Sequence, residues 1–496
     1  MRILIAGLVF LFVAVAGLFF SSFNNGKRIS FKLRVSESGR YLVKENGEPF
    51  FWLGDTGWNL FSRLNKDEAR KYLTDRHDKK FTVIQAHILG WTLADTNAYG
   101  FTPFLNNNFN KPNEPYWKHV DYIIDAADDI GLYMALVPAW ALSYTENKNR
   151  SKNDTVEMPL SRDTTTAYNY GKFLGMRYKN NKNIIWILGG DVWGTKDAIY
   201  DHLARGLTET YADNDPSQIL ISFHPQGGTH RPPATSTSEF YHNKSWLDFN
   251  MIQSGHRIGN RNYERIAKDY EILPVKPTLE SEPCYEQHPV QHSFKNGVFK
   301  PWHVRRRAYW SILAGSLGFT YGANGIWQMD KPGKIDKQSH HNFFWYDALN
   351  FEGGRQMTFV RKLIESRPIL SPQRIPDQSL IISANDSVDA HIRCARAEDY
   401  SYMMVYSTNG SAFTLDLSRM PGKVLKAWWY NPRDGKLYSG KNLVTNKPFE
   451  TLQKNAAISF DPPGDMGPDH DWILVIDDAS GSFPSPGSVF KQKSRT

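Results

Sequence analysis

The chain has 496 residues, of which 41% are hydrophobic and 22% charged. This length predicts about two domains, and the composition excludes a disordered, collagenous or coiled-coil protein. The net charge is +8, but no concentrated basic stripe is present, so we expect no nucleic-acid partner. The one tight basic run, Arg305–Arg307, is interpreted as a solvated helix face. Cys284 and Cys394 have no metal-ligand spacing and predict no disulfide framework.

The first 26 residues form a targeting segment. Arg2 precedes an apolar run from Ile3 to Phe20, and polar residues follow it. Ala14–Ala16 offers a small-x-small cleavage site, although an apolar run approaching ~20 residues can also span a bilayer. We therefore expect residues 1–26 to be a signal peptide or an uncleaved N-terminal anchor, and we favour the peptide. Any membrane tether would run only through residues 3–20, and either form predicts an exported protein that is periplasmic, cell-surface or secreted.

Strand and helix patterns alternate between residues 28 and 366. Near-continuous apolar runs predict strands that are buried on both faces: Phe51–Leu53, Val83–Leu89, Tyr133–Val137, Ile184–Leu188, Ile219–Phe223, Phe249–Ile252, Pro277–Leu279 and Gly318–Tyr321. Helical spacing separates them, as in Asn65–Glu68, which opens a helix in capping style, and in Tyr116–Ile130, Tyr168–Arg177, Ala198–Tyr211 and Val304–Ala314. Eight strand–helix units predict an α/β fold, a (β/α)₈ TIM barrel. A doubly wound sheet is the alternative, but no glycine-rich phosphate loop follows the first strand.

The sequence pattern changes after the boundary segment Arg367–Pro372. Residues 373–480 contain short alternating runs separated by turn signals, which predict an antiparallel β-sandwich. These runs are Leu380–Ser383, Tyr402–Tyr406, Ala412–Leu417, Val424–Tyr430 and Trp472–Ile476. Residues 481–496 are rich in Ser, Pro and Lys and predict a disordered tail.

Reactive or aromatic residues stand where the barrel strands end, which is the end of such barrels that carries the active site. In chain order, the candidate substrate-binding residues are Asp55, Trp58, Gln85, His87, Trp140, Trp193, His224, Gln253, His256 and Trp327. Aromatic residues make up 14% of the chain, and the tryptophans among these candidates are interpreted as platforms that stack against sugar rings. Filling of a large core is the alternative for the tryptophans. A structural hydrogen bond beneath the site is the alternative for Asp55.

Two carboxyl groups are placed to act on a glycosidic bond. That reaction needs one carboxyl group on each side of the anomeric carbon, and Asp191 and Glu282 follow the fourth and the seventh predicted strands. By analogy with the large clan of retaining barrel glycosidases, Asp191 would be the acid/base and Glu282 the nucleophile. Asp191 could instead cap the next helix. Glu286 and the deeper Glu280 compete with Glu282, and we expect Glu280 to pair with an arginine.

Other chemistries have weaker support. His87, His224 and His256 at three strand ends raise the question of a metal cluster, but the first strand has no His-x-His pair, and no His-Glu-x-x-His helix is present. A serine triad would need a Gly-x-Ser-x-Gly elbow, which is absent. We therefore expect no metal and no other cofactor.

The longer motifs resemble a known family. The segment Pro49–Trp58 resembles the opening of the apiosidase-like barrel family, glycoside hydrolase family 140, and further matching segments are Phe81–Ala86, Asn183–Asp191, Asp248–His256 and Gly325–Met329. The resemblance runs from about Arg40 to Ile364. Trp428–Pro432 and Asp471–Val475 resemble the sandwich that usually follows this barrel, whose collagen-binding label we treat as a name only.

The resemblance implies a barrel glycosidase of exported bacterial polysaccharide degradation, with its catalytic carboxylates at Asp191 and Glu282. The family's characterised activity is release of apiose from a pectin side chain. The sequence departs from the family pattern at Val192–Gly194, Glu280–Ser281 and Cys284, which line the mouth, so the sugar is left open.

The sequence as a whole predicts a retaining exo-glycosidase. Its substrate would be a plant or algal polysaccharide or oligosaccharide carrying a terminal sugar, apiose-like or related. The alternative is a non-catalytic carbohydrate-binding or adhesion protein on a barrel scaffold. The distance between the two carboxyl groups distinguishes the mechanisms. A separation of ~5–5.5 Å predicts retention of configuration, and a separation of ~6.5–9.5 Å predicts inversion.

Overall fold

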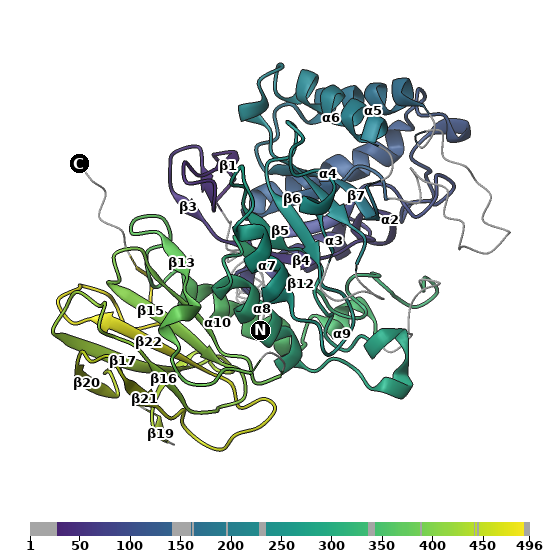
Figure 1. Cartoon of the computed structure of the whole chain (residues 1–496). Coiled ribbons are helices and arrows are strands. Elements are labelled where there is room, and N and C mark those ends of the chain that lie inside the picture. The colour runs from purple at the N-terminus through teal and green to yellow at the C-terminus, as the bar shows by residue number, and fades with distance from the viewer. Residues whose placement is uncertain are drawn as a thin grey trace, which may run out of the picture.

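The computed structural model describes residues 27–140, 160, 163–194, 197–227, 235–335, 343–386, 389–440, 442–443 and 446–490. Figure 1 shows a barrel with its helices and, beside it, a C-terminal β-sheet domain in green and yellow. Residues 1–26, which we predict to be a signal peptide or anchor, lie outside the described residues. Within the described part of the chain, no helix is long and apolar enough to cross a membrane.

The barrel is a nine-stranded sheet in the order β8-β7-β6-β5-β4-β12-β11-β10-β9. Its strands are β4 (Trp52–Thr56), β5 (Val83–His87), β6 (Tyr133–Val137), β7 (Ile184–Val192), β8 (Ile221–Pro225), β9 (Thr235–Ser236), β10 (Asn250–Gln253), β11 (Thr278–Glu280) and β12 (Gly318–Tyr321). All neighbours pair in parallel except the short β9. The barrel closes between β8 and the start of β10: the Asp248 amide donates to the Ile221 carbonyl at 2.9 Å, and the Ser222 hydroxyl donates to the Phe249 carbonyl at 2.6 Å. The predicted TIM barrel is confirmed, and each predicted strand overlaps an observed one.

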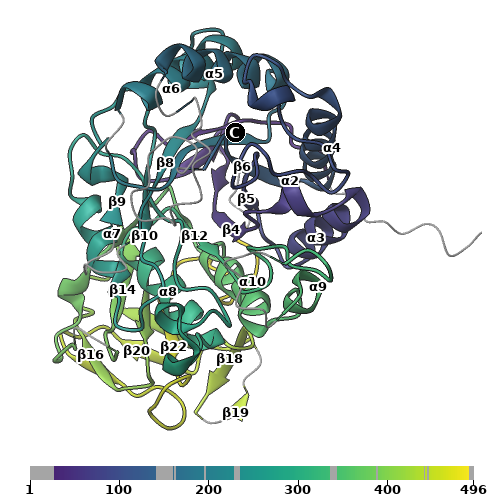
Figure 2. The same cartoon turned by 90° about the vertical axis from the view of Figure 1, so that its right-hand side faces the viewer.

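Helices surround the barrel strands, as Figure 2 shows. They are α2 (Leu60–Arg63), α3 (Lys66–Asp78), α4 (Glu114–Ile130), α5 (Thr164–Tyr178), α6 (Asp197–Tyr211), α7 (Asn262–Tyr270), α8 (Pro301–Leu313), α9 (Trp345–Ala348) and α10 (Glu352–Ile364). The predicted cap of α3 is confirmed, since the Asn65 side chain accepts from the Glu68 amide at 2.9 Å and the Glu68 carboxylate accepts from the Asn65 amide at 2.8 Å. A small antiparallel sheet of β1 (Leu33–Val35), β2 (Leu42–Lys44) and β3 (Pro49–Phe50) precedes the barrel and was not predicted.

The C-terminal domain is an antiparallel sandwich. Its large sheet runs β13 (Arg374–Pro376), β14 (Arg393–Ala397), β15 (Tyr402–Ser407), β22 (Trp472–Asp478), β17 (Val424–Asn431), β18 (Lys436–Ser439) and β19 (Asn442–Leu443), with β20 (Glu450–Gln453) paired to β17. The small sheet pairs β16 (Phe413–Leu415) with β21 (Ile458–Phe460). The predicted sandwich is confirmed. The strand predicted at Leu380–Ser383 is wrong, because Gln378–Leu380 is a 3₁₀ turn and Ile381 makes only an isolated bridge to Leu415.

The large sheet has a hydrophobic face on each side. Along β15 and β22, Met404, Tyr406 and Val475 belong to the same buried cluster as the barrel core. The alternate residues Met403, Val405 and Leu474 pack in a second cluster with the strands of the small sheet. This alternation is the strand period of two. One face of the sheet therefore covers the barrel.

Helix α8 lies in this interface. The Arg305 guanidinium is fully buried and donates to the Asp471 carboxylate at 2.7 Å and to the Gln356 amide oxygen at 2.6 Å. Arg306 pairs with Asp389 at 2.7 Å, and Arg307 donates to the Ile258 carbonyl at 2.9 Å. The interpretation of Arg305–Arg307 as a solvated helix face is therefore wrong: all three side chains are buried, Arg305 and Arg306 against the sandwich and Arg307 within the barrel domain.

The predicted disordered tail begins within the described residues. The Phe483 ring lies 5.8 Å from that of Tyr402, and the Arg367 guanidinium lies 5.2 Å over it. Arg367 is itself paired with Asp477 at 2.6 Å. Residues 491–496 lie outside the described residues.

Candidate active site

Asp191 and Glu282 meet at the barrel mouth. Asp191 is the penultimate residue of β7, and Glu282 follows the end of β11. A carboxylate oxygen of each, together with a ring nitrogen of His224 from β8, all lie within 4.8 Å of one another. Strands far apart in the sequence thus bring together the two carboxyl groups that the sequence singled out.

A local distortion of β7 presents Asp191 to the mouth. The pairing of β7 with β8 shifts register between Gly189 and Val192. Gly189, Gly190 and Asp191 have φ values of 85°, 106° and 51°, a left-handed backbone that glycine adopts freely and aspartate tolerates better than most residues. Bulges of this kind re-aim side chains next to active sites. Since Asp191 lies inside the strand and α6 begins only at Asp197, the alternative that it caps α6 is not supported.

Two histidines hold Glu282. Nε2 of His224 is 3.2 Å from one carboxylate oxygen of Glu282, and Nε2 of His256 is 3.6 Å from the other. All three side chains are nearly inaccessible to solvent. Burial alone would raise the pKa of Glu282, but the contacts with His224 and His256 outweigh it and lower the pKa to about 2. Glu282 is therefore held ionised.

Asp191 has the opposite character. Burial within the mouth and the neighbouring charge of Glu282 raise the pKa of Asp191 to about 6. Because the Asp191 side chain is open to solvent, the charge of Glu282 contributes more to this rise than burial does. A hydrogen bond with Gln253 acts against this rise. Asp191 can thus carry a proton under conditions in which Glu282 cannot.

Aromatic rings surround the carboxyl pair. Trp58 contacts Trp140 edge-to-face at 4.6 Å, and Trp140 lies 5.6 Å from the ring of His224. Trp91 continues the cluster, 5.6 Å from Trp140 and 4.6 Å from His87. Trp58 and Trp140 are buried, so they form the packed wall behind the two carboxyl groups.

Sequence reasoning missed Tyr285, which contacts several of the predicted residues. Its hydroxyl accepts a hydrogen bond from the Trp58 indole at 3.2 Å, and its ring lies 4.8 Å from His256 and 6.5 Å from Trp327. Burial and the nearby charge of Glu282 raise the pKa of Tyr285. Its position three residues after Glu282 was the available signal.

Two further histidines were also missed. His288 lies 4.3 Å from His256, ring to ring, and its Nε2 is 3.1 Å from Nδ1 of His292. His292 is exposed. Imidazole rings therefore extend from Glu282 through His256 to the protein surface.

Three predicted residues take peripheral or supporting positions. Trp193 is 40% exposed and packs edge-to-face on Phe240 at 6.0 Å, so it lies at the rim. The buried Gln85 donates to the Ser281 carbonyl at 3.3 Å and so supports the segment that carries Glu282. The Nδ1 atom of His87 contacts the Leu89 carbonyl.

Asp55 does not join the group. It is fully buried, its carboxylate accepts from the Tyr72 hydroxyl at 2.6 Å, and it lies 3.7 Å from the Arg76 guanidinium. Both partners belong to α3, so Asp55 faces the helical layer. These contacts agree with the alternative that Asp55 makes structural hydrogen bonds beneath the site.

The competing glutamates have structural partners. Glu280 accepts from the Asn262 side chain at 3.0 Å and from the Ser254 amide at 3.3 Å, and burial raises its pKa to about 7. Arg307 is close enough to lower the pKa of Glu280, but the hydrogen bonds of Glu280 go to Asn262 and Ser254 and not to the expected arginine. Glu286 accepts from the Tyr321 hydroxyl at 2.6 Å and the Gly353 amide at 3.1 Å.

The geometry also bears on metal binding. Asp191, His224 and Glu282 could together ligate a cation, since their ligand atoms lie within 4.8 Å of one another. This set differs from the three histidines considered from the sequence, of which it contains only His224. A pair with one protonated and one ionised carboxyl group matches general acid chemistry without a cation.

Comparison with known proteins adds family information. The family model described as "Apiosidase-like, catalytic domain" matches residues 36–371, and the model described as "Putative collagen-binding domain of a collagenase" matches residues 375–477. Among proteins with curated descriptions, none matches this sequence.

Two solved structures resemble nearly the whole chain. One, described as a glycoside hydrolase, is 35% identical with a TM-score of 0.80, covering 91% of this chain and 98% of the other. A second, described as a family 5 glycoside hydrolase from Bacteroides vulgatus ATCC 8482, is 32% identical with a TM-score of 0.79, covering 91% and 93%.

Proposed function

The chain belongs to the apiosidase-like family of glycoside hydrolases, and we propose that it is an exported, retaining, exo-acting glycosidase with Asp191 as acid/base and Glu282 as nucleophile. The observation that carries this proposal is the carboxyl pair itself. Oxygens of the two groups lie within 4.8 Å, and their pKa values are shifted in opposite directions. Assignment of acid and base follows from such a divergence in environment.

The two groups would act in turn. Protonated Asp191 donates its proton to the glycosidic oxygen as the ionised Glu282 attacks the anomeric carbon and forms a glycosyl–enzyme ester. Asp191, now ionised, then removes a proton from water, which attacks the same carbon and releases Glu282 as a carboxylate. Retaining enzymes separate these groups by ~5–5.5 Å and inverting enzymes by ~6.5–9.5 Å, so oxygens within 4.8 Å support retention.

The proposed substrate is a plant or algal polysaccharide or oligosaccharide with a terminal sugar that is apiose-like or related. The family description supports this sugar class. The exposed ring of Trp193 provides apolar surface for a sugar at the rim, while the buried Trp58, Trp140, His224 and His256 support the carboxyl pair from behind. Export rests on the apolar segment 3–20.

A non-catalytic binding barrel is the less favoured alternative. Protein–sugar recognition gives no reason to hold one carboxyl group ionised and its neighbour protonated. The solved structures that match at 35% and 32% identity are described as glycoside hydrolases, which also favours an enzyme.

The decisive experiment first identifies a cleaved substrate and then assigns the two carboxyl groups. A panel of pectic and algal oligosaccharides is screened for released monosaccharide. On the best substrate, Asp191→Asn and Glu282→Gln should each abolish turnover, and Glu280→Gln, a buried neighbour outside the pair, should retain it. Retained turnover in either of the first two variants would overturn the catalytic assignment.

Azide rescue tests the two roles separately. With an activated aryl glycoside, Glu282→Ala plus azide should give the glycosyl azide of inverted configuration, because azide replaces the nucleophile. Asp191→Ala plus azide should give the retained configuration, because Glu282 still forms the intermediate. The opposite pattern would exchange the two roles, and products of one configuration in both variants would contradict a retaining mechanism.

A further inference from the structure

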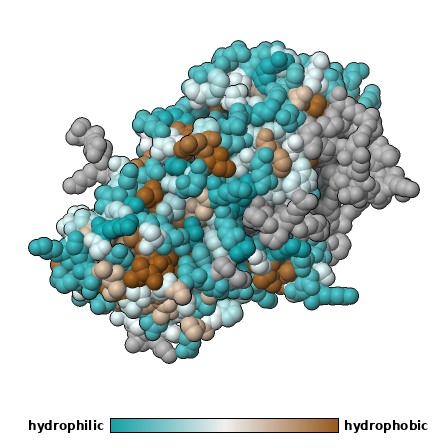
Figure 3. All heavy atoms as spheres, viewed as in Figure 1, coloured by the Kyte–Doolittle hydropathy of each residue, from teal (hydrophilic) through white to brown (hydrophobic). Residues whose placement is uncertain are grey.

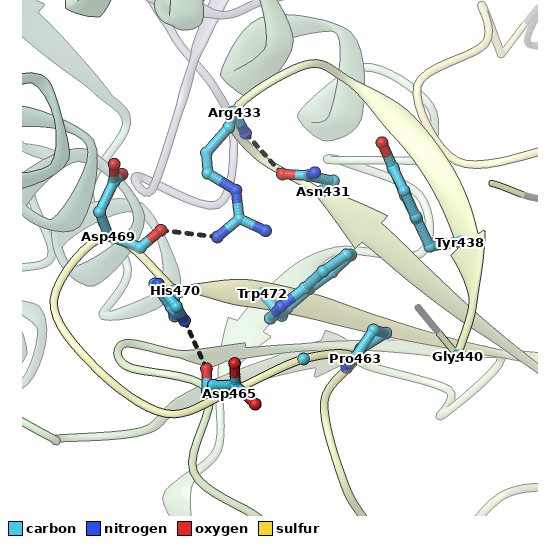
Figure 4. Close-up of a pocket in the computed structure, with 10 residues that line it drawn as sticks. Asn431, Arg433, Tyr438, Gly440, Pro463, Asp465, Asp469, His470 and Trp472 are labelled. Carbon is cyan, nitrogen blue, oxygen red and sulfur yellow. Dashed lines mark hydrogen bonds between the residues drawn. The ribbon is translucent and has the colours of Figure 1, made fainter. Parts of the chain in front are cut away.

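A cleft of about 480 Å³ opens in the C-terminal sandwich, outside the barrel site. The hairpin that joins β17 to β18 forms one side, and the loop that precedes β22 forms the other (Figure 4). We propose that this cleft binds a neutral glycan chain and so attaches the enzyme to its polymeric substrate. Only the choice of ligand class rests on the proposed function.

Aromatic rings form the floor and one wall. Trp472 lies at the base, and Tyr438 contacts it edge-to-face at 5.3 Å. The Tyr438 hydroxyl donates to the Asp434 carboxylate at 2.7 Å, which fixes the orientation of the half-buried ring. Ligand sites combine aromatic walls with a few placed polar groups, in cavities of ~300–1,000 Å³.

Donors and acceptors for hydroxyl groups surround these rings. The Arg433 guanidinium lies 4.8 Å over the Trp472 ring and donates to the Asp469 carbonyl at 2.7 Å. That bond uses one of its five N–H donors, and Figure 4 shows the side chain extending between Asn431 and Trp472. His470, whose Nδ1 lies 2.6 Å from the Asp465 carbonyl, presents its Nε2 as an acceptor in the neutral form. A sugar hydroxyl can serve both kinds of group because it donates and accepts.

The charge balance favours a neutral chain. The Asp469 carboxylate is paired with Arg305 of α8, and Arg433 lies 3.8 Å from the Asp471 carboxylate. Asp465 adds a further negative charge at the exposed rim. These carboxylates would repel the charged group of a uronic acid, whereas they can accept hydrogen bonds from the hydroxyl groups of a neutral sugar.

The cleft is preformed, which lowers the entropic cost of binding. In the hairpin, the Gly435 amide donates to the Asn431 carbonyl at 2.8 Å, and the Arg433 amide donates to the Asn431 side chain at 3.0 Å. The opposite loop is held by the Gly467 amide, which donates to the Asn409 carbonyl at 2.9 Å. Through Asp469 and Arg305, this loop is tied to the barrel, so a bound chain would stay at a fixed position relative to the active site.

The test measures polysaccharide binding by full-length protein carrying Glu282→Gln, which prevents cleavage. Affinity electrophoresis in gels that contain neutral polysaccharides (galactan, arabinan, xyloglucan) should show retardation by at least one of them. Added Tyr438→Ala or Arg433→Met should weaken binding about tenfold or more, and Tyr438→Phe, which keeps the ring, should weaken it less. The matched control is Tyr400→Ala, because Arg396 lies 3.7 Å over the Tyr400 ring in the same sandwich but outside the cleft.

Each outcome decides the proposal. Retardation that survives both Tyr438→Ala and Arg433→Met, or none by any neutral polysaccharide, overturns it. Retardation only by acidic polysaccharides, or cleft-dependent binding to collagen instead of glycans, overturns the ligand class. Thermal unfolding shows whether each variant is folded. Hydrolysis of small oligosaccharides by the single variant Tyr438→Ala should equal that of the parent. This assay tests the catalytic proposal independently of binding at the cleft.

Discussion

The rate of hydrolysis is expected to follow the protonation state of Asp191. In the proposed mechanism Asp191 must carry a proton while Glu282 is ionised. Burial and the charge of Glu282 raise the pKa of Asp191 to about 6, and the histidine contacts lower that of Glu282 to about 2. Both conditions hold only between these values, so kcat/KM should be highest in mildly acidic solution and fall as the pH rises above about 6.

The distance between the carboxyl groups accounts for the size of this effect. Oxygens of the two groups lie within 4.8 Å of each other, and unit charges at that limit interact by about 3.5 kcal/mol at an effective dielectric constant of 20 and by about 0.9 kcal/mol in bulk water. One pKa unit is about 1.4 kcal/mol, so the charge of Glu282 can supply much of the rise in the pKa of Asp191 to about 6. Two pH units above its pKa, about 1% of Asp191 is protonated, so kcat/KM at pH 8 should be about 100-fold below its plateau.

The assay compares kcat/KM from pH 4 to pH 9 for two substrates. A sugar leaving group needs the acid, whereas an activated aryl glycoside does not. The parent should show the basic limb with the oligosaccharide and not with the aryl glycoside, and Asp191→Asn should retain activity on the aryl glycoside alone. Glu280 is the matched control, because burial raises its pKa to about 7 and it could produce a similar limb. A basic limb of the same size with the aryl glycoside, or loss of the limb in Glu280→Gln with the oligosaccharide, would refute the reasoning.

Three further results are expected. His256→Gln removes a contact that lowers the pKa of Glu282, so the acid limb of the rate profile should move to higher pH; an unmoved limb would contradict this role. Dialysis against EDTA should leave hydrolysis unchanged; a loss that a divalent cation restores would show that the carboxyl pair binds metal. Arg305→Met leaves Asp471 buried without its main partner and should lower the free energy of unfolding in urea by about 3–5 kcal/mol, whereas Arg361→Met, in a partly exposed pair, should cost no more than about 1 kcal/mol.

The barrel could be predicted because its strands are buried on both faces. An apolar run such as Tyr133–Val137, in which every residue is buried, can be recognised as a buried strand from its composition alone. The carboxyl pair followed from strand order, because residues after the fourth and the seventh strands must share one end of a closed barrel. The apiosidase-like resemblance stated from the sequence is confirmed by the match to residues 36–371.

The errors arose where a residue's environment comes from a distant part of the chain. Helical spacing predicts that α8 has a buried face toward the barrel, but not that a second domain covers Arg305 and Arg306. Asp55 lies near the end of β4, where the pattern places site residues, yet its side chain faces Tyr72 and Arg76 of α3. Tyr285 lies in a segment without regular structure, where periodicity assigns no direction to a side chain.

The backbone of β7 explains why an aspartate can serve as the acid here. Aspartate is one methylene shorter than glutamate, so its carboxyl group reaches a partner only if the backbone approaches more closely. The left-handed residues Gly189–Asp191 and the register shift before Val192 provide a backbone path that a regular strand cannot follow. The glycines permit the turn, and the turn brings Asp191 to within the distance of Glu282 at which charge raises its pKa. The proposed assignment of Asp191 as the acid and Glu282 as the nucleophile therefore depends on this backbone path.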